Sequence, residues 1–244
     1  FHLYGLIVGI AVIAVFLISE KFALNYGFSE KLFSKIAIAI LFGSIVGARA
    51  WHVFTDFSLY KENFQEIFYL WQGGLSILGA VLGGWFCLIF LAKKYHFDQK
   101  ILLDSLAFSL PVGQFIGRWA NYFNQELYGS PTSLPWKIFI DLDNRVTGYE
   151  GFSYFHPLFL YEGLLALVGL SFLIYLFKTK TYYFGSGQFF YIYIFYYLFI
   201  RFFLDFLRLE RSQVIGYFGT NQLIILLTFI FIISCKFLMK WQKN

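Results

Sequence analysis

The chain is a succession of long apolar segments separated by short polar ones. Seven segments consist mostly of hydrophobic residues, and each is near the roughly 20 residues that an α-helix needs to cross a bilayer. They cover residues 3–19, 34–54, 75–92, 101–123, 157–177, 188–207 and 222–239. This pattern predicts an all-α, polytopic membrane protein with about seven transmembrane helices. Because we find no internal repeat and no linker, we expect a single integral-membrane domain over residues 1–244.

The connections between these segments differ in character. The longest runs over residues 124–156 and contains Pro131, Pro135 and the polar string DLDNRVTGYEG. It is predicted to form a folded extracytoplasmic loop region with a short hairpin. The third apolar segment is rich in glycine, which allows a close helix approach or a break, and Gly73–Gly74 before it predict a turn or a re-entrant entry.

Lysine and arginine are distributed unevenly over the connections. With the N-terminus outside, the inner segments and Lys35 at the edge of the second span hold eleven of these residues, whereas the outer loops hold five. Such a bias predicts an outer N-terminus and a cytoplasmic C-terminus. The net charge of +5 then reflects topology and attraction to anionic membrane lipids, and nothing suggests a nucleic-acid partner.

Composition supports the membrane assignment and limits the possible chemistry. The chain is 59% hydrophobic and only 14% charged, whereas a soluble domain carries about a quarter charged residues. Its four histidines are scattered and its two cysteines show no metal-ligand or disulfide spacing. We therefore expect no metal site and no cofactor.

Three arginines lie inside or at the edge of the apolar segments, namely Arg49, Arg118 and Arg201. A guanidinium remains charged there. Burying it in the bilayer costs from a few to more than about ten kcal/mol, depending on the method. Three such residues indicate an anionic partner at membrane depth, and a lipid phosphate fits. The alternative is pairing within the protein, with Asp104 or Glu126 beside Arg118, or a structural salt bridge for Arg49. Asp104 is otherwise expected at the interface.

Arg118 is the second residue of the string GRWANYFNQELYG, residues 117–129. Asn121 follows three residues later and shares its helix face, and Asn124, Glu126 and Gly129 follow as the segment leaves the membrane. This order predicts a cation, two carboxamides and a carboxylate around one cavity at the outer leaflet.

Other candidates are more ambiguous. Arg201, Asp205 and Arg208 share one stripe of the sixth span, although Arg208 is close enough to the end to snorkel. Gln72, His156 and Tyr4 are each assigned to headgroup binding. Packing, helix capping and an aromatic belt are the respective structural alternatives for these three residues.

The string GRWANYFNQELYG closely resembles the signature of the prolipoprotein diacylglyceryl transferase family, G-R-x-(G/A)-N-F-hydrophobic-N-x-E-x-x-G. The strings WQGGLS, HPLFLYEG, SGQFF and RFFLDFLR extend the resemblance over nearly the whole chain. It implies a multi-pass protein of the bacterial cytoplasmic membrane, with a central lipid-binding cavity. Its activity would transfer the diacylglyceryl group of phosphatidylglycerol to the lipobox cysteine in a prolipoprotein signal peptide, the first step of lipoprotein maturation, and release glycerol phosphate.

The resemblance also assigns residues to this reaction. Arg118, Arg201 and Glu126 match catalytic positions, and the matching substrate-binding positions are Tyr4, Arg49, Asn121, Asn124, Gly129, Asp205 and Arg208. Tyr122 replaces the usual phenylalanine of the signature, and Leu78 replaces the histidine that many members carry in the third span. Glu126 and His156 are then the candidate bases for the thiol. The alternatives are a non-catalytic lipid-binding protein, a small-anion transporter and a transferase with another acceptor.

Overall fold

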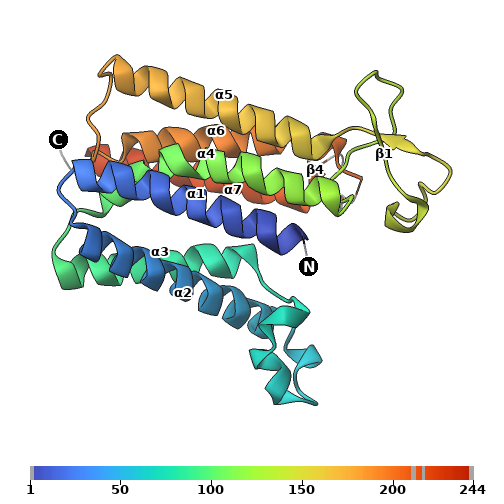
Figure 1. Ribbon diagram of the computed structural model, residues 1–244, viewed down its shortest axis with the longest axis horizontal. Coiled ribbons are helices and arrows are strands. Elements are labelled where there is room, and N and C mark those ends of the chain that lie inside the picture. The colour runs from blue at the N-terminus through green and yellow to red at the C-terminus, as the bar shows by residue number, and fades with distance from the viewer. Residues whose placement is uncertain (1–2, 210–212, 216–217, 242–244) are drawn as a thin grey trace.

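The computed structural model describes residues 3–209, 213–215 and 218–241, and the side chains of residues 3–209 and 218–230. Within these residues, seven α-helices coincide with the seven predicted segments and extend beyond most of them (Figure 1). They are α1 (Leu3–Asn25), α2 (Glu30–Thr55), α3 (Ile77–Tyr95), α4 (Gln99–Phe123), α5 (Leu158–Lys178), α6 (Gln188–Leu204) and α7 (Thr220–Trp241). The all-α, polytopic fold is therefore confirmed.

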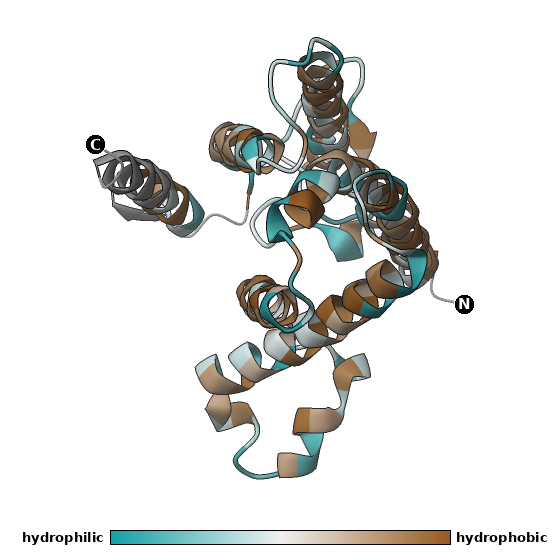
Figure 2. Cartoon of the chain, turned by 90° about the vertical axis from the view of Figure 1, so that its left-hand side faces the viewer, coloured by the Kyte–Doolittle hydropathy of each residue, from teal (hydrophilic) through white to brown (hydrophobic). Residues whose placement is uncertain are grey.

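Apolar side chains cover the outside of these helices. The helices α1, α2, α3, α5 and α6 are long and apolar enough to cross a membrane. The helix α4 is equally long, but it buries polar residues such as Asp104, Ser105 and Ser109. Figure 2 shows hydrophobic residues along the helices and hydrophilic residues mainly in the connections. The chain is thus a multi-pass membrane protein.

The long connections gather at one end of the molecule, where α1 also begins (Figure 1). Between α2 and α3 lie the short 3-10 helices η1 (Phe57–Leu59), η2 (Phe64–Phe68) and η3 (Leu70–Gln72). The connection between α4 and α5 contains η4 (Leu142–Asn144) and an antiparallel pair of strands, β1 (Ile138–Phe139) and β2 (Tyr154–Phe155), which confirms the predicted hairpin. The connection between α6 and α7 contains η5 (Asp205–Leu207), β3 (Gln213–Ile215) and β4 (Phe218–Gly219).

Glycines allow α2 and α3 to pack backbone against backbone. A Cβ atom on Gly47 would lie 2.4 Å from the carbonyl oxygen of Gly79, and one on Gly79 would lie 2.3 Å from that of Gly47. Any larger side chain would therefore push the helices apart. The close approach predicted from the glycine-rich third segment is confirmed. Gly73 and Gly74, which lie between η3 and α3, both have positive φ, a conformation that favours glycine.

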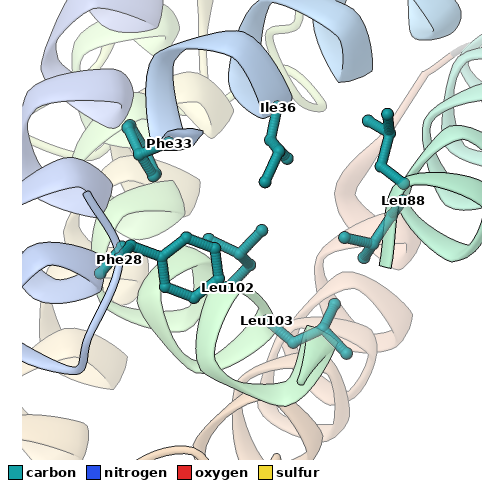
Figure 3. Close-up of a cluster of buried hydrophobic side chains, with 8 residues drawn as sticks. Phe28, Phe33, Ile36, Leu88, Leu102 and Leu103 are labelled. Atoms are coloured by element: carbon teal, nitrogen blue, oxygen red, sulfur yellow. The ribbon is translucent and has the colours of Figure 1, made fainter. Parts of the chain in front are cut away.

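A cluster of buried apolar side chains joins α1, α2, α3 and α4 (Figure 3). It lies where α1 ends and α2 begins, opposite the long connections (Figure 1). Phe28 comes from the turn after α1, Phe33 from α2, Leu88 from α3, and Leu102 and Leu103 from α4. From this end α4 runs through the bundle and packs on α1, α5 and α6. It therefore carries its last turns, including Arg118, between α5 and α6.

Asp104 fixes α6 against α4. Its side chain is fully buried, and its Oδ2 atom accepts hydrogen bonds from the backbone N–H groups of Gly185 and Gly187, both at 2.9 Å. Its Oδ1 atom accepts from the N–H of Phe190 at 3.1 Å. The N–H groups at a helix start lack partners within the helix, so Asp104 caps α6 from a distance. The expected pairing of Asp104 with an arginine is wrong, because its carboxylate accepts from backbone N–H groups instead.

Candidate functional site

Arg118 and Arg201 meet at a single carboxylate. Arg118 lies near the end of α4 and Arg201 near the end of α6, and both form ion pairs with Glu162 of α5. Nη2 of Arg118 contacts Oε2, and Nη1 of Arg201 contacts Oε1. The side chain of Glu162 is only 5% exposed, against 24% for Arg118 and 16% for Arg201. The two arginines thus converge, and the anion between them belongs to the protein.

No motif in the sequence pointed to a role for Glu162. The available signal was its charge inside the apolar segment 157–177, because an ionisable residue in a membrane span usually serves a function. Asp104 and Glu126 had been considered as partners of Arg118. Both alternatives are wrong, since Asp104 caps α6 and Glu126 accepts a hydrogen bond from Asn121.

An inner cavity lies beside this cluster, between α4, α5 and α6. Its lining includes Gln114, Arg118, Glu162 and Arg201 together with aromatic and aliphatic side chains such as Tyr193. The cavity measures about 30 Å³, whereas a single water molecule needs roughly 10–15 Å³, so it is small. Because its walls are largely apolar, interactions between charges are stronger here than in water.

A larger outer cavity of about 570 Å³ opens where α4 ends. Five predicted site residues line it, namely Tyr4, Asn121, Asn124, Glu126 and Arg208. They come from the start of α1, the end of α4, the turn after it and the segment after α6. The structure therefore brings together side chains that are far apart in the sequence.

Asn121 connects the two cavities. Its Oδ1 atom accepts a hydrogen bond from Nη1 of Arg118 at 3.3 Å, and its Nδ2 atom donates to Oε1 of Glu126 at 2.6 Å. Arg118 lines the inner cavity, whereas Asn121 and Glu126 line the outer one. We expected Arg118, Asn121 and Glu126 to share one cavity. The structure instead has two cavities, and the buried carboxamide of Asn121 joins them.

An unusual turn holds Glu126 in place. Its neighbours Gln125 and Leu127 have φ values of 52° and 57°, a left-handed conformation that costs an L-residue roughly 1–2 kcal/mol. Gln125 is fixed by Asp141, because its Nε2 atom donates to Oδ2 at 2.5 Å and its Oε1 atom accepts from the Asp141 N–H at 2.6 Å. The sequence analysis missed this pair, and no motif in the loop pointed to it.

Gly129 and His156 close the turn beside the outer cavity. The N–H of Gly129 donates to the carbonyl oxygen of His156 at 2.9 Å. A Cβ atom on Gly129 would lie 3.0 Å from both the Cβ of His156 and the carbonyl oxygen of Leu207, so this position favours glycine. The Nδ1 atom of His156 lies 3.1 Å from the hydroxyl of Tyr161.

Asp205 is buried at the end of α6, with 1% of its surface exposed. Its Oδ1 atom accepts a hydrogen bond from Nδ2 of Asn221 at 3.3 Å. Among the described residues, its Oδ2 atom has no hydrogen-bond partner. Asp205 thus connects α6 to α7 and lines neither cavity.

Arg49 holds the connection between α2 and α3. Its guanidinium donates to the carbonyl oxygens of Ile67 (2.8 Å), Gly73 (2.7 Å), Gly74 (3.0 Å) and Glu66. The structural salt bridge considered for Arg49 is wrong, because its partners are backbone carbonyl groups. Gln72 is exposed in the same connection, and neither residue lines the inner or the outer cavity.

The chain is similar in sequence to one family of known proteins. The family model for prolipoprotein diacylglyceryl transferase matches residues 1–239. The chain is 35% identical over 229 residues to a relative from Prochlorococcus marinus (strain MIT 9215). The aligned region covers 87% of this chain and 77% of the relative. A relative from Gloeobacter violaceus is 35% identical over 223 residues, covering 91% and 82%, and one from Cutibacterium acnes is 33% identical over 231 residues, covering 93% and 77%. Each is named phosphatidylglycerol–prolipoprotein diacylglyceryl transferase. The chain therefore belongs to the prolipoprotein diacylglyceryl transferase family.

Proposed function

We propose that this protein transfers the diacylglyceryl group of phosphatidylglycerol to the cysteine thiol of a prolipoprotein, the first step of lipoprotein maturation. The observation that carries the proposal is the convergence of Arg118 and Arg201 on one buried anion within an apolar bundle. The lysine bias supports a position in the bacterial cytoplasmic membrane with the outer cavity and the N-terminus outside and the C-terminus in the cytoplasm.

Charge development at the phosphate explains the need for two arginines. In the reaction the thiol loses its proton, a sulfur–carbon bond forms, and the bond between the glyceryl carbon and the phosphate oxygen breaks. The electron pair of that bond stays on the phosphate, so negative charge grows there. Guanidinium groups of Arg118 and Arg201, held in place before the reaction, stabilise this charge and orient the phosphate through bidentate hydrogen bonds.

The acceptor cysteine enters through the outer cavity. Glu126 faces this cavity and accepts the thiol proton. Asn121, which is hydrogen-bonded to both Glu126 and Arg118, holds Glu126 in a fixed position relative to Arg118. Tyr4, Asn124 and Arg208 line the same cavity and contact the headgroup or the signal peptide. Nearby cations favour the thiolate, which is the reactive form of the cysteine.

The direct test uses purified protein, phosphatidylglycerol and a synthetic lipobox peptide. Mass spectrometry is expected to show the peptide with one added diacylglyceryl group and glycerol phosphate as the second product. A peptide with serine in place of the lipobox cysteine serves as the control. A stable, folded protein that gives no adduct with any bacterial phospholipid would refute the proposed activity.

Leu78→His tests whether the reaction needs the histidine of the third span. Leu78 lies in the first turn of α3, is 49% exposed and lines neither cavity. We therefore expect the wild-type protein to be active and Leu78→His to leave the rate unchanged or lower it. A pH–rate profile of both proteins checks this. An inactive wild type beside an active Leu78→His variant would show that the histidine is essential.

Gln125→Ala tests the turn that holds Glu126. Loss of the hydrogen bonds to Asp141 should lower kcat about tenfold, since small displacements of catalytic groups are costly. Gln125→Gly loses the same bonds but fits the positive φ without strain, so it is the matched control. If Gln125→Gly regained the wild-type rate, backbone strain and not the contact with Asp141 would explain the effect.

A further inference from the structure

We propose that Glu162 sets the charge of the arginine pair so that the site holds a phosphodiester monoanion and releases a phosphomonoester dianion. Glu162 is then a specificity-determining residue for the phosphate group. The inference rests on the proposed function and extends it from the transfer step to product release. It depends on the contacts of Glu162 and on the change in ligand charge during the reaction.

The two arginines and Glu162 together carry one net positive charge, because two guanidinium groups share one carboxylate. Each oxygen of Glu162 contacts a single nitrogen of one arginine, whereas a guanidinium has five N–H donors. Within the described part of the chain, no group accepts a hydrogen bond from the Nε–H of Arg118 or Arg201. Both arginines therefore keep N–H donors for a phosphate while Glu162 stays bound to them, and the inner cavity of about 30 Å³ must widen to admit it.

The ligand changes its charge during the proposed reaction. The phosphate of phosphatidylglycerol is a diester with one negative charge. Cleavage of its carbon–oxygen bond turns it into a monoester, whose second pKa is about 6. The product therefore approaches two negative charges at neutral pH. A site with one net positive charge matches the donor, and the carboxylate of Glu162 repels the additional charge of the product.

The surroundings make this charge difference effective. Glu162 is almost fully buried, and the inner cavity beside it is lined mainly by apolar and aromatic side chains. Electrostatic interactions are weakly screened in such an environment. A purely structural Glu162, by contrast, would support binding of both phosphate forms equally, so the preference between them distinguishes the two roles.

The experiment compares equilibrium binding of two soluble headgroup analogues at pH 7.5. Glycerophosphoglycerol is the deacylated donor and carries one charge, and glycerol 1-phosphate is the dianionic product. Titration calorimetry with the wild type and Glu162→Gln gives the ratio of the two dissociation constants. We expect Glu162→Gln to shift this ratio at least about tenfold in favour of glycerol 1-phosphate.

Two further variants separate charge from general damage. Glu162→Asp retains the negative charge and should keep the wild-type ratio. Glu62→Gln removes a carboxylate from an exposed position in the connection between α2 and α3, and it should also leave the ratio unchanged. In transfer assays, Glu162→Gln should become more sensitive to inhibition by added glycerol 1-phosphate.

An unchanged ratio in folded Glu162→Gln would overturn the proposal. If this variant does not fold, the wild type decides, because a wild type that binds the dianion tenfold or more tightly than the monoanion contradicts the charge matching. The binding measurement requires no acceptor peptide and no turnover. A missing transferase activity would therefore refute the proposed function while the binding ratio still tests the role of Glu162.

Discussion

Arg201→Lys should lower kcat/KM for diacylglyceryl transfer by about 100-fold or more, the range found when a preorganised donor to a developing oxyanion is removed. Lysine keeps the charge, but its ammonium group cannot reproduce the planar fork that binds a phosphate and a carboxylate together. Arg201 contacts Glu162 with one nitrogen and has further donors available for the phosphate. Arg118→Lys should have a similar effect, because both arginines share the same carboxylate.

The matched control is Arg145→Lys. Arg145 lies in the loop between α4 and α5, where its guanidinium donates to the carbonyl oxygens of Ile140 and Glu150, and it lines neither cavity. Its replacement should change the transfer rate only slightly. Initial rates from peptide mass measurements at several phosphatidylglycerol concentrations provide the comparison. A folded Arg201→Lys protein with nearly wild-type kcat/KM would remove Arg201 from the catalytic machinery.

Asp104→Ala should produce the largest loss of stability among the substitutions considered. It removes the acceptor of three backbone N–H groups at Gly185, Gly187 and Phe190. An unsatisfied buried donor costs about 1–3 kcal/mol, so the expected loss in the free energy of unfolding is about 3 kcal/mol or more. The start of α6 would lose its attachment to α4, and Arg201 at the other end of α6 would lose its fixed position.

Asp98→Ala provides the comparison for this effect. Asp98 caps α4 through a hydrogen bond of 2.9 Å from the N–H of Lys100, but it is exposed and caps its own helix. Loss of an ordinary helix cap costs about 1 kcal/mol. Unfolding of both variants in detergent, followed by helical circular dichroism, measures the difference. Equal losses in the free energy of unfolding for the two substitutions would show that the burial of Asp104 adds no stability beyond that of an ordinary helix cap.

The helices and the arginines could be predicted from the sequence because a bilayer strongly limits what a chain can do. A spanning segment must be helical and apolar, and a charged residue within it needs a partner. Arg118 and Arg201 are charged residues in such segments, so the sequence predicted an anionic partner for them. The glycines of α3 could likewise be identified as a site of close helix packing, whereas their contact with Gly47 of α2 is seen only in the structure.

The partners of these groups could not be predicted, because they depend on which helix faces meet in space. Glu162 was visible as a charge in an apolar segment, yet nothing in the sequence placed it between two arginines from other helices. Asp104 was expected either to balance an arginine or to lie at the interface, and nothing in the sequence indicated that its carboxylate caps α6, which begins 84 residues later in the chain. Gln125 gave no signal, since its contact with Asp141 depends on the folded loop.

The most direct test of the phosphate site is an experimental structure of the protein in lipid with phosphatidylglycerol bound. We expect the lipid phosphate within hydrogen-bond distance of both Arg118 and Arg201, with Glu162 still contacting the two guanidinium groups. The glyceryl carbon should face the outer cavity near Glu126. A phosphate bound elsewhere, for example at Arg49, with the Arg118–Glu162–Arg201 cluster closed and unchanged, would contradict this arrangement.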